Sequence, residues 1–275
     1  MNGERLIVNR GGGGGPVYRL LFTVHALLCL LPHPVAAQIQ DNSFLLEEAY
    51  NQESGVVQHI SAFSRSRGGD WTYTFTQEWP LGGIRHQLSY TIPVERTSDN
   101  GAGLGDIGVN YRHQLLGNPE ATTVAAARLS LLLPTGDENS GRGAGGIGLQ
   151  ANLPITVMLG PRWATHWNAG STLTPTARNG LGAEETTVSF NLGASAIWLL
   201  RPSFNLLVEA LWLSTDVVGT GREEAAFLNP GVRLALDVGS LQIVPGAGYT
   251  IGLNDAAGDD ALFLYLSLEH PFQRQ

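Results

Sequence analysis

Eight charged side chains alternate with apolar residues along extended stretches of the sequence. Successive side chains of a strand point to opposite faces, so with the apolar residues outward these charges would face an enclosed interior. Arginines and carboxylates in such an interior are expected to pair. They could fill it as a structural ladder of ion pairs, or form a polar constriction that selects a solute. These predicted lumen-lining residues are Glu78, Arg85, Arg112, Arg128, Glu209, Arg233, Asp237 and Glu269.

Four apolar side chains share the inward parity of these charges: Leu207, Leu211, Phe263 and Tyr265. They could form an apolar patch for an aromatic or acyl ligand, or they could be packing. The sequence alone does not separate these two interpretations.

No catalytic, cofactor-binding or metal site is predicted. His59, His86, His113, His166 and His270 lie in strand regions with serines nearby, but the sequence has no Gly-x-Ser-x-Gly nucleophile turn. No helix follows the glycine-rich stretches 101–105 and 141–148, so they do not indicate phosphate binding. The acidic stretch 254–260 lacks the ligand spacing of a calcium loop. We therefore expect no enzyme, with a membrane-embedded lipid-modifying activity as the enzymatic alternative.

The clearest strand that could position these residues runs from Trp71 to Trp79. Trp71, Tyr73, Phe75 and Trp79 share one face, and threonines and Glu78 share the other. Tilted by about 40°, this strand covers roughly 20 Å of membrane normal, close to the apolar band of an outer-membrane barrel. Aromatic girdles mark both interfaces of such barrels. The predicted girdle residues are Trp71, Trp79, Trp163, Trp198 and Trp212.

Twelve strand candidates follow one another, joined alternately by short and long connections. Outer-membrane barrels have short periplasmic turns and longer external loops, and an even strand count leaves both termini periplasmic. Only 15% of the residues are charged, below the usual share of a soluble domain. We predict an all-β, closed antiparallel transmembrane barrel, with a two-sheet soluble sandwich as the alternative. The candidates are approximately 56–66, 70–79, 84–94, 105–115, 122–133, 147–157, 162–174, 186–199, 203–214, 226–238, 240–252 and 260–270.

The N-terminal part divides into two further regions. Residues 1–37 read as an extension and a signal peptide with an apolar core at 20–31, cleaved near Ala37. The only cysteine, Cys29, lies inside it, which excludes disulfides from the mature chain. Residues 38–55 form a periplasmic lead-in or a plug, with a helix possible from Phe44 to Tyr50. The barrel is assigned to residues 56–272.

Three segments resemble one family of proteins. They are Gly103-Leu104-Gly105-Asp106-Ile107 leading to Tyr111-Arg112, then Leu132-Leu133-Pro134-Thr135-Gly136-Asp137, then Asn229-Pro230-Gly231-Val232-Arg233, and Glu209 also fits the pattern. They resemble the putative MetA-pathway of phenol degradation family over residues 80 to 270. The resemblance implies an outer-membrane barrel, and some members are linked to the uptake of aromatic compounds. Physically, the glycines permit tight turns, and Asp106 and Asp137 can accept hydrogen bonds from nearby amides.

The leading functional prediction is a passive outer-membrane channel or transporter for small aromatic or hydrophobic solutes in a Gram-negative bacterium. The alternative is a non-conducting structural or assembly barrel. Expected partners are outer-membrane lipid, lipopolysaccharide, the barrel-assembly machinery and a small solute. The formal net charge of −8 argues against nucleic acid, and no cofactor is expected.

Overall fold

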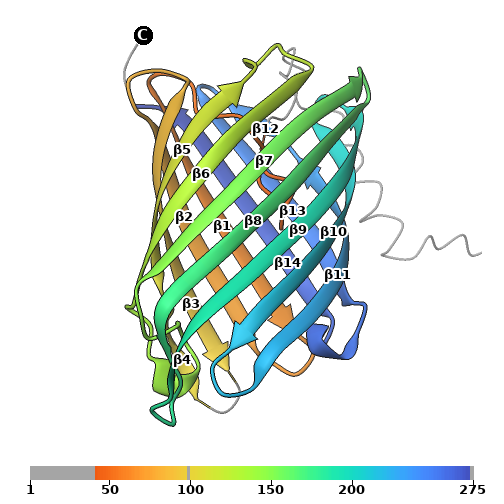
Figure 1. Ribbon diagram of the computed structural model, residues 1–275. Helices are drawn as coiled ribbons and strands as arrows, with labels where there is room; N and C mark the ends of the chain where they lie inside the picture. The colour runs from red at the N-terminus through yellow and green to blue at the C-terminus, as the bar shows by residue number, and fades with distance from the viewer. Residues whose placement is uncertain (1–40, 98–99, 273–275) are drawn as a thin grey trace, which may run out of the picture. The chain divides into compact units, whose positions relative to one another are not determined.

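The structure, a computed structural model, describes residues 41–97 and 100–272. The predicted signal segment, residues 1–37, lies outside the described residues. The described chain is almost entirely strand and forms one tilted, closed barrel (Figure 1). Its strands are β1 (Val56–Ser66), β2 (Trp71–Pro80), β3 (His86–Thr97), β4 (Gly101–Leu104), β5 (Ile107–Leu116), β6 (Thr123–Leu133), β7 (Gly148–Gly160), β8 (Trp163–Arg178), β9 (Glu184–Arg201), β10 (Phe204–Val217), β11 (Gly221–Leu234), β12 (Leu236–Val238), β13 (Leu241–Gly252) and β14 (Ala261–Pro271).

Every wall strand pairs antiparallel with its sequence neighbours, and β1 pairs with β14. The pairing of β11 with β13 completes the circle, while β12 continues β11 past Ala235. Only β4 stands off this path, as a short hairpin partner of β3. The prediction of a closed barrel of 12 antiparallel strands is therefore confirmed, with β4 and β12 as two extra strands. Closure leaves the sheet without an unpaired edge, which a protein surrounded by lipid requires.

The external hairpins contain more strand than the sequence suggested. Residues 175–185 and 215–225 were expected as long loops, but β8–β9 and β10–β11 continue through most of them. Cross-strand ion pairs join the strands near each tip: Arg178 contacts Glu184 at 2.9 Å, and Arg222 contacts Asp216 at 2.8 Å. Opposite charges across a strand pair stabilise the pairing. The polar composition of these residues suggested loops, but it belongs to strands that extend past the apolar part of the barrel.

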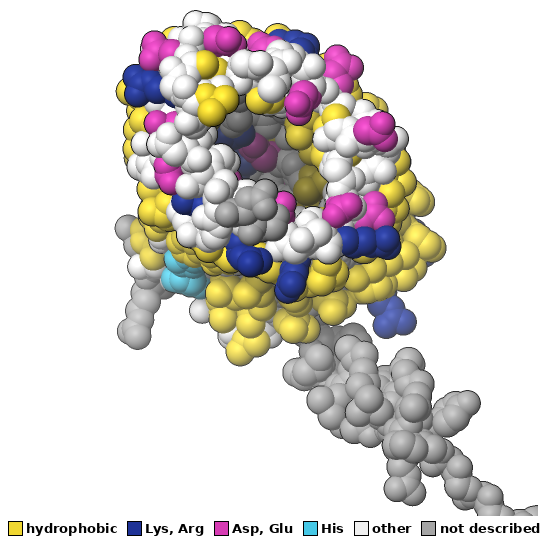
Figure 2. Space-filling view, turned by 90° about the horizontal axis from the view of Figure 1, so that it is seen from below, with side chains coloured by type: hydrophobic (Ala, Val, Ile, Leu, Met, Phe, Trp, Pro, Cys, Tyr) yellow, Lys and Arg dark blue, Asp and Glu magenta, His cyan; other side chains and the backbone are white. Residues whose placement is uncertain are grey.

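Large apolar side chains cover the outside of the barrel (Figure 2). Leu129 is 60% exposed and Leu149 is 55% exposed, whereas Ser130, the neighbour of Leu129 in sequence, is buried. Trp163 and Trp198 lie outward on β8 and β9, with stacked rings whose centroids are 5.9 Å apart. A strand that turns leucines outward and hydroxyls inward is adapted to lipid. Within the described residues, no helix is long and apolar enough to cross a membrane.

The external end carries turns built around Asp106. Its carboxylate accepts hydrogen bonds from the backbone N–H of Gly136 at 3.0 Å and of Ala144 at 2.7 Å. Asp137 accepts a hydrogen bond from the N–H of Asn139 at 3.2 Å and contacts Arg142 at 3.4 Å. The amide-binding roles expected for both aspartates are therefore confirmed, and Asp106 connects the β5 rim to the β6–β7 loop.

Candidate functional site in the barrel lumen

Residues 41–54, called here the luminal segment, lie inside the barrel toward the end where β1 begins and β14 ends. Most of the segment is buried, including Leu46 and Ala49. The helix considered for residues 44–50 does not form. A helix is absent because wall side chains bind the backbone amides and carbonyls that a helix would have paired internally.

Glu209 on β10 binds the first half of the segment. One carboxylate oxygen, Oε1, accepts hydrogen bonds from three successive N–H groups, those of Phe44 at 2.9 Å, Leu45 at 2.9 Å and Leu46 at 3.1 Å. The other oxygen accepts one from Asn229 at 2.7 Å. Successive N–H groups that converge in this way form an anion-binding concavity. A carboxylate of the wall thus occupies a nest made by the luminal segment.

Two arginines bind carbonyls of the segment at its two ends. Arg233 on β11 donates to the carbonyls of Asp41 at 2.7 Å and Asn42 at 2.6 Å. Arg112 on β5 donates to the carbonyl of Tyr50 at 2.5 Å and to Asn51 Oδ1 at 2.8 Å. The planar guanidinium group offers several donors in fixed directions, so one arginine can hold two groups at once.

Three glycines of the wall receive side chains of the segment. A Cβ added to Gly231 or Gly246 would lie 2.5 Å from a ring carbon of Phe44, and one added to Gly193 would collide with Leu46. Glycine inside a strand often marks the close approach of another part of the chain. These glycines create notches into which Phe44 and Leu46 fit.

Polar side chains hold the second half of the segment. Asn168 accepts from the N–H of Glu47 at 3.1 Å and donates to its carbonyl at 2.8 Å. Thr156 accepts from Ala49 at 2.9 Å, and Gln87 accepts from Gln52 at 2.8 Å. The backbone of the segment is therefore bound from wall strands on both sides of the lumen.

Above the luminal segment, hydrogen bonds between side chains run around part of the wall. Asn110 donates to Thr91, Arg128 donates to Asn110 at 3.2 Å and to Gln150 at 2.8 Å, and Gln150 donates to Thr172 at 3.0 Å. Figure 2 looks into the external end and shows a hollow mouth with charged side chains on its rim and inside. The lumen is therefore open from outside and polar down to the segment.

Two buried carboxyl groups of the segment are incompletely paired. Within the described part of the chain, Asp41 Oδ2 and Glu48 Oε2 have no hydrogen-bond partner. Burial raises the pKa of Asp41, although the Arg233 guanidinium opposes this. Burial raises the pKa of Glu48 well above its ordinary value, and the carboxylate of Asp41 adds to the effect. Burial therefore favours the protonated form of both carboxyl groups while the segment is in place.

The eight charges predicted for the lumen separate into two groups. Arg112 and Glu78 form a pair at 3.5 Å, and Arg128 pairs with Glu47 of the segment at 2.7 Å. The structure does not show a ladder of pairs within the wall, because four of the eight charges bind the segment instead. Six occupy inward positions of their strands: Glu78, Arg112, Arg128, Glu209, Arg233 and Glu269.

Arg85 and Asp237 lie near the end of the barrel and are exposed to solvent. Arg85 lies exposed in the turn between β2 and β3, and Asp237 is exposed on β12, where it accepts a hydrogen bond from Gln242 at 3.2 Å. Asp237 lies opposite Gln242, which lies opposite Glu269, and residues opposite each other share a face of the sheet. The lumen-lining role of Arg85 and Asp237 therefore stays a prediction.

The apolar candidates also separate. Leu207, Phe263 and Tyr265 pack together around Phe44, whereas Leu211 is not part of this buried cluster. Phe44 and its glycine notches were not predicted as site residues. Their signal in the sequence is the occurrence of glycine at inward strand positions where polar residues otherwise alternate.

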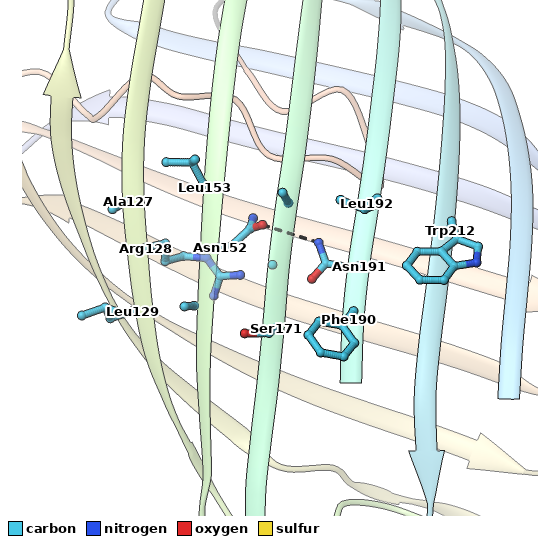
Figure 3. Close-up of a pocket in the computed structure, with 13 residues that line it drawn as sticks. Ala127, Arg128, Leu129, Asn152, Leu153, Ser171, Phe190, Asn191, Leu192 and Trp212 are labelled. Carbon is cyan, nitrogen blue, oxygen red and sulfur yellow. Dashed lines mark hydrogen bonds between the residues drawn. The ribbon is translucent and has the colours of Figure 1, made fainter. Parts of the chain in front are cut away.

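A separate hollow of about 550 Å³ lies against strands β6 to β10 (Figure 3). Small residues, including Ala127, Ala151 and Ala169, thin the wall there. Phe190 and Leu192 beside them are exposed on the outer surface. Its apolar lining thus belongs to the lipid-facing side, which separates it from the luminal site.

The family model described as "Putative MetA-pathway of phenol degradation" matches residues 38–259. An outer membrane channel from Pseudomonas putida F1 has a similar fold, with a TM-score of 0.62 and 12% identity over 86% of this chain and 100% of that one. No curated protein matches the chain.

Two further solved structures are more distant. The KdgM porin in complex with disordered oligogalacturonate has a TM-score of 0.47 and 5% identity over 79% of this chain and 99% of that one. The CymD monoaromatic hydrocarbon channel has a TM-score of 0.43 and 11% identity over 81% and 90%.

Proposed function

The chain belongs to the putative MetA-pathway of phenol degradation family, and from that premise we propose an outer-membrane channel for small aromatic or hydrophobic solutes, closed by its luminal segment. The observation that carries this proposal is the way the segment is held. Wall side chains bind its backbone, and glycine notches receive Phe44 and Leu46. None of these contacts is a strand pairing, so the segment can leave while the barrel stays closed on itself.

The two ends of the lumen support a gated passage. The external mouth is hollow, and the closing residues belong to one short stretch next to β1. Hydrogen bonds to charged groups contribute about 1.5–3 kcal/mol each, and burial of a large apolar side chain contributes about 1.5–3 kcal/mol. Several such contacts act together, so the closed state dominates and opening is infrequent.

Deletion of residues 41–54 tests the proposal. We expect the variant to show large, frequent conductance steps in planar bilayers, whereas the unaltered protein shows few. Heat-modifiable migration in gels establishes that both barrels are folded. A folded deletion variant without conductance would contradict the channel and favour the non-conducting structural barrel.

The proposal includes no catalytic step. Within the described residues, no histidine ring is hydrogen-bonded to a serine hydroxyl. His166 Nδ1 lies 2.9 Å from Thr156 Oγ1, but that hydroxyl also accepts from the N–H of Ala49 beneath the segment. This arrangement supports a role in holding the segment rather than in activating a nucleophile.

A further inference from the structure

We propose that the recess filled by Phe44 is a binding site for an uncharged, single-ring aromatic compound, and that Phe44 is its built-in occupant. The inference deepens the proposed function and rests on it, because it names the chemistry of the solute and the place where it would compete with the closing segment.

The recess has the shape of one ring. Gly231 and Gly246 leave flat backbone against the Phe44 ring, and a Cβ at either would lie 2.5 Å from a ring carbon. Phe263 and Tyr265 contact it from another side, with ring centroids 5.4 and 5.5 Å away and tilts of 35° and 43°. Tilted rings at this separation are a favourable aromatic arrangement. Aliphatic side chains of the same buried cluster complete the lining.

While the segment is docked, as it is in a variant that lacks only the Phe44 ring, the recess presents no free charge to a ligand. Arg233 is engaged by the carbonyls of Asp41 and Asn42, and Glu209 is engaged by three N–H groups and Asn229. The hydroxyl of Tyr265 donates to Asp41 at 2.5 Å. A charged ligand would lose its hydration without gaining a partner, so the ring must be uncharged.

The occupant and the walls belong to separable parts of the protein. Gly231, Gly246, Phe263 and Tyr265 lie on β11, β13 and β14, whereas Phe44 belongs to the luminal segment. The walls therefore remain when the segment leaves. A tethered occupant has a high effective concentration, so a free ring competes weakly with Phe44 in the unaltered protein. Removal of the Phe44 ring should expose the site, since buried apolar cavities of about 150 Å³ in proteins bind benzene.

The test compares Phe44→Ala with Leu46→Ala. Both variants truncate a buried apolar side chain of the luminal segment, but only the first empties an aromatic recess. The probe is 4-fluorophenol, followed by fluorine NMR on protein in nanodiscs. We expect saturable binding to Phe44→Ala at least tenfold tighter than to Leu46→Ala, whose signal reports only partition into lipid.

Two further arms keep the proposal falsifiable. Adding Gly246→Ala to Phe44→Ala should abolish saturable binding, because a methyl group then occupies the notch. Fluorocyclohexane tests whether the site requires an aromatic ring, and binding as tight as that of 4-fluorophenol would overturn the aromatic assignment. Equal binding of 4-fluorophenol by Phe44→Ala and Leu46→Ala would overturn the site. The binding assay does not depend on conductance. Failure of the channel proposal and failure of the ring site would therefore give different results.

Discussion

The two halves of the luminal segment are held by different chemistry. Residues 41–46 lie against an apolar recess, with Phe44 in its glycine notches and one carboxylate, Glu209, on three amides. Residues 47–52 lie against a polar wall, where Asn168, Thr156 and Arg112 each bind one or two backbone groups. The first half depends on shape and on one shared acceptor, and the second on many independent hydrogen bonds. The first half should therefore be the easier one to release with a single substitution.

Substitution of Glu209 should have the largest effect. Glu209→Ala leaves three buried N–H groups without their acceptor, and each unsatisfied group costs about 1–3 kcal/mol, so we expect docking to weaken by about 3 to 5 kcal/mol. Hydrogen exchange of the amides of residues 44–46 should accelerate strongly, while those of residues 47–52 respond less. Glu209→Gln keeps an acceptor oxygen and should show a smaller effect. Equal acceleration in both halves would contradict the division.

The glycine notches should give an intermediate effect. Gly231→Ala or Gly246→Ala places a methyl group against the Phe44 ring, and overpacking of this kind costs about 1–3 kcal/mol. Gly108→Ala on β5 is the matched control, because its Cβ meets no atom closer than 3.4 Å. Channel opening frequency should rise for the notch variants and stay unchanged for the control. A similar rise in Gly108→Ala would show that any added methyl group disturbs the lumen.

The pH dependence of docking should be the smallest of the three effects. Burial raises the pKa of Glu48 well above its ordinary value of 4.5. The docked segment therefore binds a proton at Glu48 more tightly than the released segment does, so docking is strongest below about pH 4.5 and weakens as pH rises toward the docked pKa. Each pH unit in that interval costs at most about 1.4 kcal/mol for one group.

Glu48→Gln provides the check on that pH dependence. Opening frequency of the unaltered protein should rise with pH from pH 4.5 upward, and the rise should shrink in Glu48→Gln. Glu53→Gln, at an exposed position of the same segment, is the control and should leave the profile unchanged. A profile that Glu48→Gln does not alter would assign the pH response to other carboxyl groups.

Most of the barrel could be predicted from residue alternation, and most of the luminal site could not. The run from Trp71 to Trp79 shows its lipid-facing side in its own sequence, and β2 covers that run. Alternation does not reveal that Arg85 and Asp237 lie exposed at the end of the barrel, because the position of each strand end depends on neighbouring strands. The helix considered for residues 44–50 failed for a related reason, since the acceptor for its amides, Glu209, lies 165 residues from Phe44 along the chain.

Residue alternation alone establishes which side chains face lipid, because the two-residue period of a strand is a local property of the backbone. Closure, strand number and the aromatic face all follow from that period and from turn composition. What the inward residues bind, in contrast, depends on the folded barrel. Three glycines on three strands become a site for Phe44 and Leu46 only when the barrel closes and brings them to one side of the lumen. Contacts of that kind join residues far apart in the chain, and no local pattern records them.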